Sequence, residues 1–142
     1  MGIKMTDNRL SADLDHILEH TRGCWEELRG ARIFITGGTG FFGCWLLESF
    51  AWANDKLGLN ARALVLTRNL EAFLKKAPHL ATNPTINFHI GDVRSYDFPQ
   101  GSFSHVIHAA TESSVNTINQ TPLTMFDTIV EGTRHTLEFS TA

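Results

Sequence analysis

A glycine-rich run follows one short apolar segment and precedes a longer one. It reads Thr36-Gly-Gly-Thr-Gly-Phe-Phe-Gly43. Glycine is needed where φ is positive and where a side chain would hold a ligand away from the backbone. The N-terminus of a helix offers unpaired N–H groups and a positive dipole end to an anion. With a strand before it and a helix after it, the run predicts a site for the pyrophosphate of a dinucleotide.

The run fits two related glycine motifs. Gly38, Gly40 and Gly43 have the spacing G-x-G-x-x-G, and counting from Thr36-Gly37 gives T-G-x-x-G-x-x-G. The leading Thr-Gly favours the second motif. A glycine-rich turn that binds nothing is the alternative, and the strand and helix expected on either side argue against it.

Short β-branched segments alternate with helical ones around this run. Strands are predicted at Arg32–Thr36, Arg62–Thr67, Thr85–Ile90 and Ser104–Ala109. Helices are predicted at 41–55, at 70–77 and from Pro122 onward, the last with an inner face of Leu123, Phe126, Val130, Thr133 and Leu137. This alternation is typical of an α/β fold with a doubly wound parallel sheet of the Rossmann type. Only strands 1 to 4 of that fold are expected, so we expect a truncated segment of it.

An amphipathic helical region precedes the first strand. Apolar residues recur at three- and four-residue spacing between Leu10 and Leu28. We therefore divide the chain into an N-terminal helical extension, residues 1–30, and a cofactor-binding segment, residues 31–142.

Composition narrows the class of protein. The 142 residues include 12 basic and 15 acidic ones, which offers no general affinity for nucleic acid. No apolar run is long enough to span a membrane, and no secretory signal is recognisable, so we expect a cytoplasmic protein. Cys24 and Cys44 are expected to be free thiols.

A metal site is not expected from the seven histidines. His16 and His20 are four residues apart on the first helix but lack the Glu of His-Glu-x-x-His. His105 and His108 are three apart on one strand, so their side chains point to opposite faces.

Four segments, in this order, resemble the extended short-chain dehydrogenase/reductase superfamily, specifically its NAD(P)-dependent nucleotide-sugar epimerases and dehydratases. They are the glycine run, Gly91-Asp-Val93, His108-Ala-Ala-Thr-Glu-Ser113 and Glu131-Gly-Thr133. The loop Ala110-Thr-Glu-Ser-Ser-Val-Asn116 is most similar to that of dTDP-glucose 4,6-dehydratases. The resemblance covers the chain from about Arg32 onward.

The resemblance implies a role for each matching position. The residues around the pyrophosphate would be Gly37, Gly40, Phe41, Phe42 and Gly43. Asp92 would accept a hydrogen bond from the adenine amino group, with Val93 beside it, although a turn residue is the alternative for Asp92. Ala109, Ala110 and Thr111 would form the wall near the nicotinamide ribose. Glu112 and Ser113 would face the sugar nucleotide, with an exposed loop acid as the alternative for Glu112.

Arg68 bears on the choice between NAD and NADP. NAD-selective sites place an acid after the second strand, about 20 residues beyond the glycines, whereas this strand ends in Thr67-Arg68. An arginine there can neutralise a 2'-phosphate, which favours NADP, but stacking on adenine would also allow NAD. Both cofactors therefore stay open.

Two further positions differ from the pattern of the family, and both concern catalysis. Ile129 stands where many relatives carry an Asn that supports the active-site hydrogen bonds. The only tyrosine, Tyr96, has Gln100 four residues on instead of the Lys of the family's Tyr-x-x-x-Lys base. No catalytic residue is therefore expected in this chain.

These features together predict the cofactor-binding part of a nucleotide-sugar epimerase or dehydratase, inactive alone. In such enzymes a hydride is transferred transiently at a sugar carbon. A non-catalytic NAD(P)-binding regulatory module is the alternative. A homodimer formed through the sheet edge beside the fourth strand is a further alternative.

Overall fold

A four-stranded parallel sheet forms the centre of the protein. The computed structural model describes residues 9–111 and 122–142. The strands are β1 (Arg32–Thr36), β2 (Arg62–Thr67), β3 (Ile86–Ile90) and β4 (His105–His108), in the spatial order β3-β2-β1-β4. All three neighbouring pairs are parallel. The predicted strands and the Rossmann-like fold are confirmed, since this order is that of the first four strands of a doubly wound sheet.

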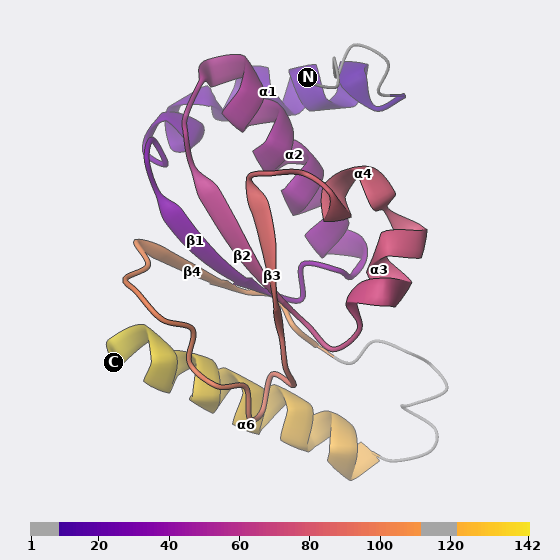
Figure 1. Cartoon of the computed structure of the whole chain (residues 1–142), viewed down its shortest axis with the longest axis vertical. Coiled ribbons are helices and arrows are strands. Elements are labelled where there is room, and N and C mark those ends of the chain that lie inside the picture. The colour runs from indigo at the N-terminus through magenta and orange to yellow at the C-terminus, as the bar shows by residue number, and fades with distance from the viewer. Residues whose placement is uncertain (1–8, 112–121) are drawn as a thin grey trace.

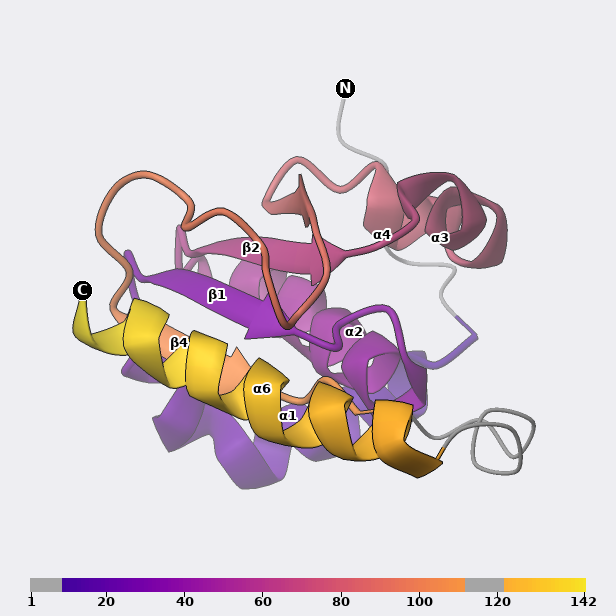
Figure 2. The same ribbon diagram turned by 90° about the horizontal axis from the view of Figure 1, so that it is seen from below.

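Helices cover both faces of the sheet. They are α1 (Ser11–Glu26), α2 (Phe41–Leu57), α3 (Leu70–Lys76), α4 (Pro78–Ala81) and α6 (Pro122–Thr141). Figures 1 and 2 show α6 lying along one face of the sheet, with α1 and α2 on the opposite side. Among the described residues, no helix combines the length and apolar character needed to cross a membrane.

Local signals in the sequence set several helix ends. Asn69 caps α3, because its side chain accepts a hydrogen bond from the backbone N–H of Ala72 at 2.9 Å. Gly58 ends α2 in the left-handed conformation, with φ of 57°. The Asn54 side chain then holds the return to β2, since it both donates to and accepts from the Ala61 backbone at 3.0 Å.

Alternate strand residues supply two separate cores. Ile33, Ile35 and Val65 face α2 and α3, where they pack with Leu47, Phe50 and Phe73 in one buried cluster. Phe34 and Leu66 point the other way and pack with Val93, Tyr96 and Phe139. Burial on both faces explains why these strands are apolar runs.

The first helix packs on α2. Leu14 is buried, and the Trp52 indole donates to Asp15 Oδ1 at 2.8 Å. Leu18, Trp25 and Leu28 also contact the larger core. Residues of the amphipathic region thus contribute to the packing beneath the sheet.

The predicted inner face of the last helix is wrong. Leu123, Phe126, Val130 and Leu137 are 42–77% exposed. The residues buried against the sheet are instead Thr128, Gly132 and Thr136. The reason is close packing: a Cβ atom at Gly132 would lie 2.9 Å from Val93 Cγ1, so only a small residue lets the helix approach this closely.

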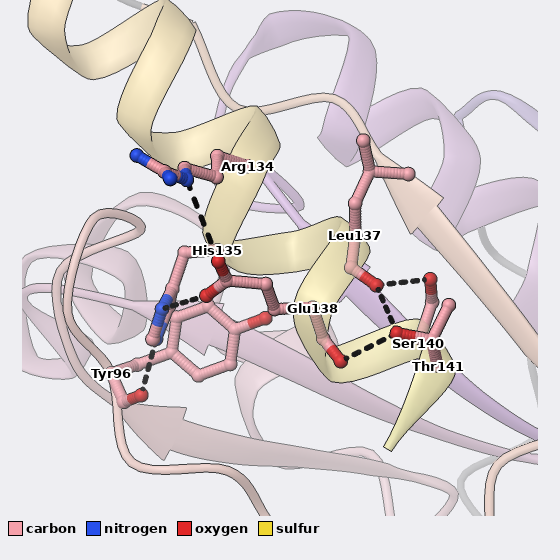
Figure 3. Close-up of polar contacts among 7 residues, drawn as sticks. All are labelled: Tyr96, Arg134, His135, Leu137, Glu138, Ser140 and Thr141. Carbon is pink, nitrogen blue, oxygen red and sulfur yellow. Dashed lines mark hydrogen bonds and ion pairs between the residues drawn. The ribbon is translucent and has the colours of Figure 1, made fainter.

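Aromatic and polar contacts hold the C-terminal half of α6. The Phe139 and Phe34 rings lie 4.8 Å apart in an edge-on arrangement. His135 Nε2 donates to the Tyr96 carbonyl oxygen at 2.8 Å, as Figure 3 shows. On the helix surface, Arg134 pairs with Glu138 at 3.5 Å. These contacts join α6 to the segment that follows β3.

Candidate functional site

A pocket of about 370 Å³ lies beyond the carboxyl ends of the strands. In open α/β sheets ligands bind at this edge. All eleven described residues predicted to contact a cofactor line it: Gly37, Gly40, Phe41, Phe42, Gly43, Arg68, Asp92, Val93, Ala109, Ala110 and Thr111. Glu112 and Ser113 lie outside the described residues. The structure therefore gathers segments far apart in the sequence around one cavity.

Five further residues line the pocket that the sequence analysis did not assign to it: Thr39, Leu66, Thr67, Gly91 and Thr128. Thr39, Thr67 and Gly91 are adjacent in the chain to predicted residues, and Leu66 lies two residues before Arg68, so their inclusion follows from the glycine turn and the strand ends. Thr128 is different, because it comes from α6. Its burial on the sheet side of that helix could have been anticipated only if the small residues had been recognised as the packed face.

The glycines of the turn have different structural roles. Gly37 has φ of +73°, and the Ala109 backbone occupies the space that its Cβ would need. The Gly37 carbonyl likewise occupies the space for a Cβ at Gly43. For Gly40 the nearest atom to a Cβ would be Gly37 O, at 3.3 Å. Gly37 and Gly43 thus permit close backbone packing, whereas Gly40 keeps the pocket floor free of a side chain.

The turn leads directly into α2. Gly40 is the N-cap, and its carbonyl accepts from the Cys44 N–H at 2.9 Å. The three preceding N–H groups, of residues 41 to 43, are the ones that a helix leaves without partners inside it. They belong to pocket-lining residues. The donor set and the positive end of the helix dipole fit an anionic pyrophosphate.

Charged and aromatic groups surround the turn. Lys76 Nζ donates to the Thr39 carbonyl at 2.8 Å and so ties α3 to the turn. Phe41 and Phe42 are 73% and 78% exposed at the pocket, with their rings 5.5 Å apart and nearly perpendicular. Two exposed aromatic rings at a pocket provide apolar surface that a ligand could cover.

Asp92 is already engaged by a neighbour. Arg94 donates to Oδ1 from its backbone N–H at 2.9 Å and from Nε at 2.8 Å, and to Oδ2 from Nη2 at 3.0 Å. These hydrogen bonds hold the pKa of Asp92 below its usual value despite partial burial, and the Arg68 charge acts in the same direction. Since each carboxylate oxygen can accept two hydrogen bonds, Oδ2 keeps one acceptor position for a ligand.

Comparison with known proteins adds an independent finding. The family model described as GDP-mannose 4,6 dehydratase matches residues 34–142. The chain belongs to this family of sugar-nucleotide dehydratases and epimerases. It is 30% identical over 115 residues to CDP-glucose 4,6-dehydratase of Salmonella typhimurium, covering 78% of this chain and 30% of that protein. It is 32% identical over 112 residues to UDP-glucose 4-epimerase of Rickettsia bellii, covering 77% and 32%.

The chain spans about a third of the length of these relatives. Among solved structures it resembles that of Pen from Bacillus thuringiensis, with a TM-score of 0.64 and 22% identity, covering 80% of this chain and 34% of that one. This likeness supports the fold.

In this member of the GDP-mannose 4,6-dehydratase family, Tyr96 is part of the core. Its ring packs 5.4 Å from Phe34 and 4.7 Å from His135. Burial raises the pKa of its phenol, although the nearby Thr136 hydroxyl acts in the opposite direction. Tyr96 does not line the pocket. Both its position and its pKa are the reverse of what a catalytic base requires.

Three potential metal ligands lie together on α1. His16, Glu19 and His20 offer ligand atoms that all lie within 4.8 Å of one another, and all three residues are exposed. Glu19, which precedes the second histidine, was not expected as a third ligand. His20 Nδ1 donates to the His16 carbonyl at 2.8 Å within the helix. We assign no metal to this group, because exposed side chains of these types gather on helices without one.

Proposed function

We propose that this chain is the cofactor-binding part of an NAD(P)-dependent nucleotide-sugar epimerase or dehydratase. The observation that carries the proposal is the single pocket around which all eleven described candidate residues lie. Support comes from the relatives, which are named as a 4,6-dehydratase and as 4-epimerases of nucleotide sugars. Calorimetric titration of the chain with NAD and NADP tests it.

The pocket offers different chemistry at its two ends. We assign the pyrophosphate to the N-terminus of α2, where Gly40 leaves the backbone open. The adenosine half is assigned to the end that holds Asp92, Val93 and Arg68. The small side chains at 109–111 would then stand beside the nicotinamide ribose. Glu112 and Ser113 are proposed to face the sugar nucleotide.

Nicotinamide, when bound, supplies transient hydride transfer at a sugar carbon. The described residues of this chain bind and orient that group and exclude water from one side of it. We propose that the chain alone does not turn over, because its only tyrosine is buried outside the pocket. A chromatographic assay of the sugar nucleotide formed from CDP-glucose or UDP-glucose checks this expectation, because the hydride returns to the sugar and no reduced nicotinamide accumulates.

NADP is proposed as the preferred cofactor. Arg68 lies at the pocket on the residue after β2, the position where NAD-selective sites carry an acid. A guanidinium there can bind a 2'-phosphate with two N–H groups and neutralise its charge.

A non-catalytic NAD(P)-binding regulatory module is the second candidate. The burial of Tyr96 favours it, since binding residues are then present in this chain without a base. Cofactor binding is common to both candidates. Turnover in a longer chain that carries Tyr-x-x-x-Lys would decide for the enzyme.

We propose a homodimer whose interface is the exposed face of α6, because large exposed apolar side chains gather there, and we keep the sheet edge beside β4 as the alternative interface. Leu123, Phe126, Val130 and Leu137 are exposed and follow one another at spacings of three, four and seven residues, the pattern of a helix that pairs with another. In an antiparallel pair, Leu123 of one copy approaches Leu137 of the other. Asp127 and Arg134 then lie on the same flank with opposite charges, so a second copy complements the face in charge as well as in shape.

A further inference from the structure

A chain of hydrogen bonds joins the pocket wall to α6 through the two neighbouring strands β1 and β4. The Ala110 N–H donates to Thr36 Oγ1 at 3.3 Å, and Thr36 Oγ1 lies 2.7 Å from His108 Nδ1. His108 Nε2 lies 3.2 Å from Thr133 Oγ1 on α6. Thr36 and His108 are register partners in β1 and β4, so both side chains point to the same face of the sheet.

The donors and acceptors fix where the protons lie. Thr36 is fully buried, and its oxygen accepts from Ala110, so its own proton needs an acceptor. Within the described part of the chain, His108 Nδ1 is the contact that can accept it. With this assignment Nδ1 carries no proton, and the neutral ring carries its proton on Nε2, which donates to Thr133. Burial lowers the pKa of His108, which favours this neutral form.

The same hydrogen bonds extend the pairing of β1 with β4 beyond the end of the strand. β4 ends at His108, and the Ala109 N–H still donates to the Thr36 carbonyl at 3.1 Å. The Thr36 hydroxyl then accepts a hydrogen bond from the next backbone N–H, that of Ala110. Both alanines line the pocket, and the Ala109 backbone fills the space beside Gly37. The Thr36 carbonyl thus holds Ala109, and the orientation of the Thr36 hydroxyl decides whether Ala110 is held as well.

We propose that His108 is a positioning residue for the cofactor pocket. It orients the Thr36 hydroxyl, which holds Ala110 and places the wall at 109–111 against the glycine turn. His108 itself does not line the pocket, so it acts through Thr36. The inference rests on the proposed function, because the wall is assigned to the nicotinamide side of the cofactor. Thr133 contributes by holding the far side of the ring, which makes α6 part of the same arrangement.

The test compares four proteins by calorimetric titration with NAD and NADP: the wild type, His108→Leu, His108→Asn and the control His105→Asn. Leucine removes both hydrogen bonds. Asparagine can place an acceptor oxygen where Nδ1 lies but cannot reach Thr133. His105 lies on the same strand with an exposed side chain and contacts Ser104 at 3.0 Å. Circular dichroism and a melting curve establish that each variant is folded.

His108→Leu is expected to raise the cofactor Kd about three- to tenfold, the range for one lost hydrogen bond. His108→Asn should restore most of the affinity, and His105→Asn should leave it unchanged. In the wild type, the ring nitrogen chemical shifts of His108 should be those of the neutral Nε2–H tautomer. This last measurement needs no variant, so it decides the question even if His108→Leu does not fold.

An unchanged Kd in folded His108→Leu, or an Nδ1–H tautomer in the wild type, would overturn the positioning role. Equal weakening in the leucine and asparagine variants would also overturn it, because the acceptor for Thr36 would then not matter. If the wild type binds neither cofactor, the proposed function fails and this inference fails with it. If the wild type binds and the variants bind equally well, only the inference fails.

Discussion

The carbonyl oxygen of Gly37 occupies the position that a Cβ atom at Gly43 would take. Gly37 is the first glycine of the turn, and Gly43 lies in the first turn of α2. The helix therefore begins in direct contact with the backbone it follows. This contact sets how close the N-terminus of α2 comes to the carboxyl end of β1, and hence where the pocket floor lies.

Gly43→Ala should strongly destabilise the fold. The clash is with backbone atoms, which cannot move aside as a flexible side chain can. We expect a loss of at least about 2 kcal/mol in the free energy of unfolding, measured in urea, comparable to overpacking a core. Gly23→Ala is the matched control. No atom lies within 4 Å of its Cβ position, so the alanine should stabilise α1 by up to about 1 kcal/mol. Equal stability of the two variants would contradict the packing role of Gly43.

Arg68→Ala should separate the two cofactors. Loss of a charge-assisted hydrogen bond to a 2'-phosphate is expected to raise the Kd for NADP about 10- to 100-fold. The Kd for NAD should change much less, because NAD carries no phosphate there. Calorimetric titration of both ligands gives the ratio. Equal weakening of both would assign Arg68 to adenine stacking, and no change in either would remove it from the site.

The sheet and the pocket were predictable from sequence, but the packing of α6 was not. Arg32–Thr36 and Arg62–Thr67 are apolar enough to mark strands and end abruptly at turn residues, so their limits could be predicted. Their parallel pairing brings Gly40, Arg68 and Asp92 to one edge. The apolar residues of α6, in contrast, recur at helical spacing, which predicts an apolar face but does not show whether the sheet lies against that face. Here Thr128 and Gly132 face the sheet because their small side chains permit close approach.

Hydrogen bonds between secondary-structure elements could not be predicted from the sequence either. His108 was assigned to a strand face, but nothing in its spacing relates it to Thr133, 25 residues later. Asp92 could be placed at the pocket, whereas its paired hydrogen bonds to Arg94 depend on a tight turn after β3.

Stability should rise with pH through His108 and Asp92. The folded pKa of each lies below its ordinary value, 6.5 for His108 and 3.8 for Asp92. The unfolded chain then binds more protons, so protonation favours unfolding. The His108 contribution is present above about pH 6.5 and is lost as the pH falls through the folded pKa. That of Asp92 is lost in the same way at more acid pH.

Melting temperatures of the wild type and His108→Asn, compared between about pH 8 and pH 5, check the first part. The change in melting temperature between the two pH values should be smaller in the variant, because asparagine does not titrate. An identical difference in both proteins would show that His108 has the same pKa folded and unfolded.

Val130→Glu should abolish self-association without unfolding the chain. Val130 is 42% exposed and lies at the centre of the apolar face of α6. In an antiparallel pair it would approach its own counterpart, so the variant would bring two carboxylates together. Sedimentation equilibrium should show a concentration-dependent dimer for the wild type and a monomer for Val130→Glu. A wild-type monomer at all concentrations would contradict the proposed dimer.

The most direct test of the proposed cofactor site is calorimetric titration of the wild type and Gly40→Val with NAD and NADP. The valine Cβ would lie 3.3 Å from Gly37 O, close enough to need a small adjustment, and the backbone at Gly40 is extended, so the fold should survive. Its branched side chain would stand at the end of α2, where the pyrophosphate is proposed to bind. We predict saturable binding to the wild type and none to folded Gly40→Val. Absence of binding to the wild type, or equal Kd values for the two proteins, would contradict the account.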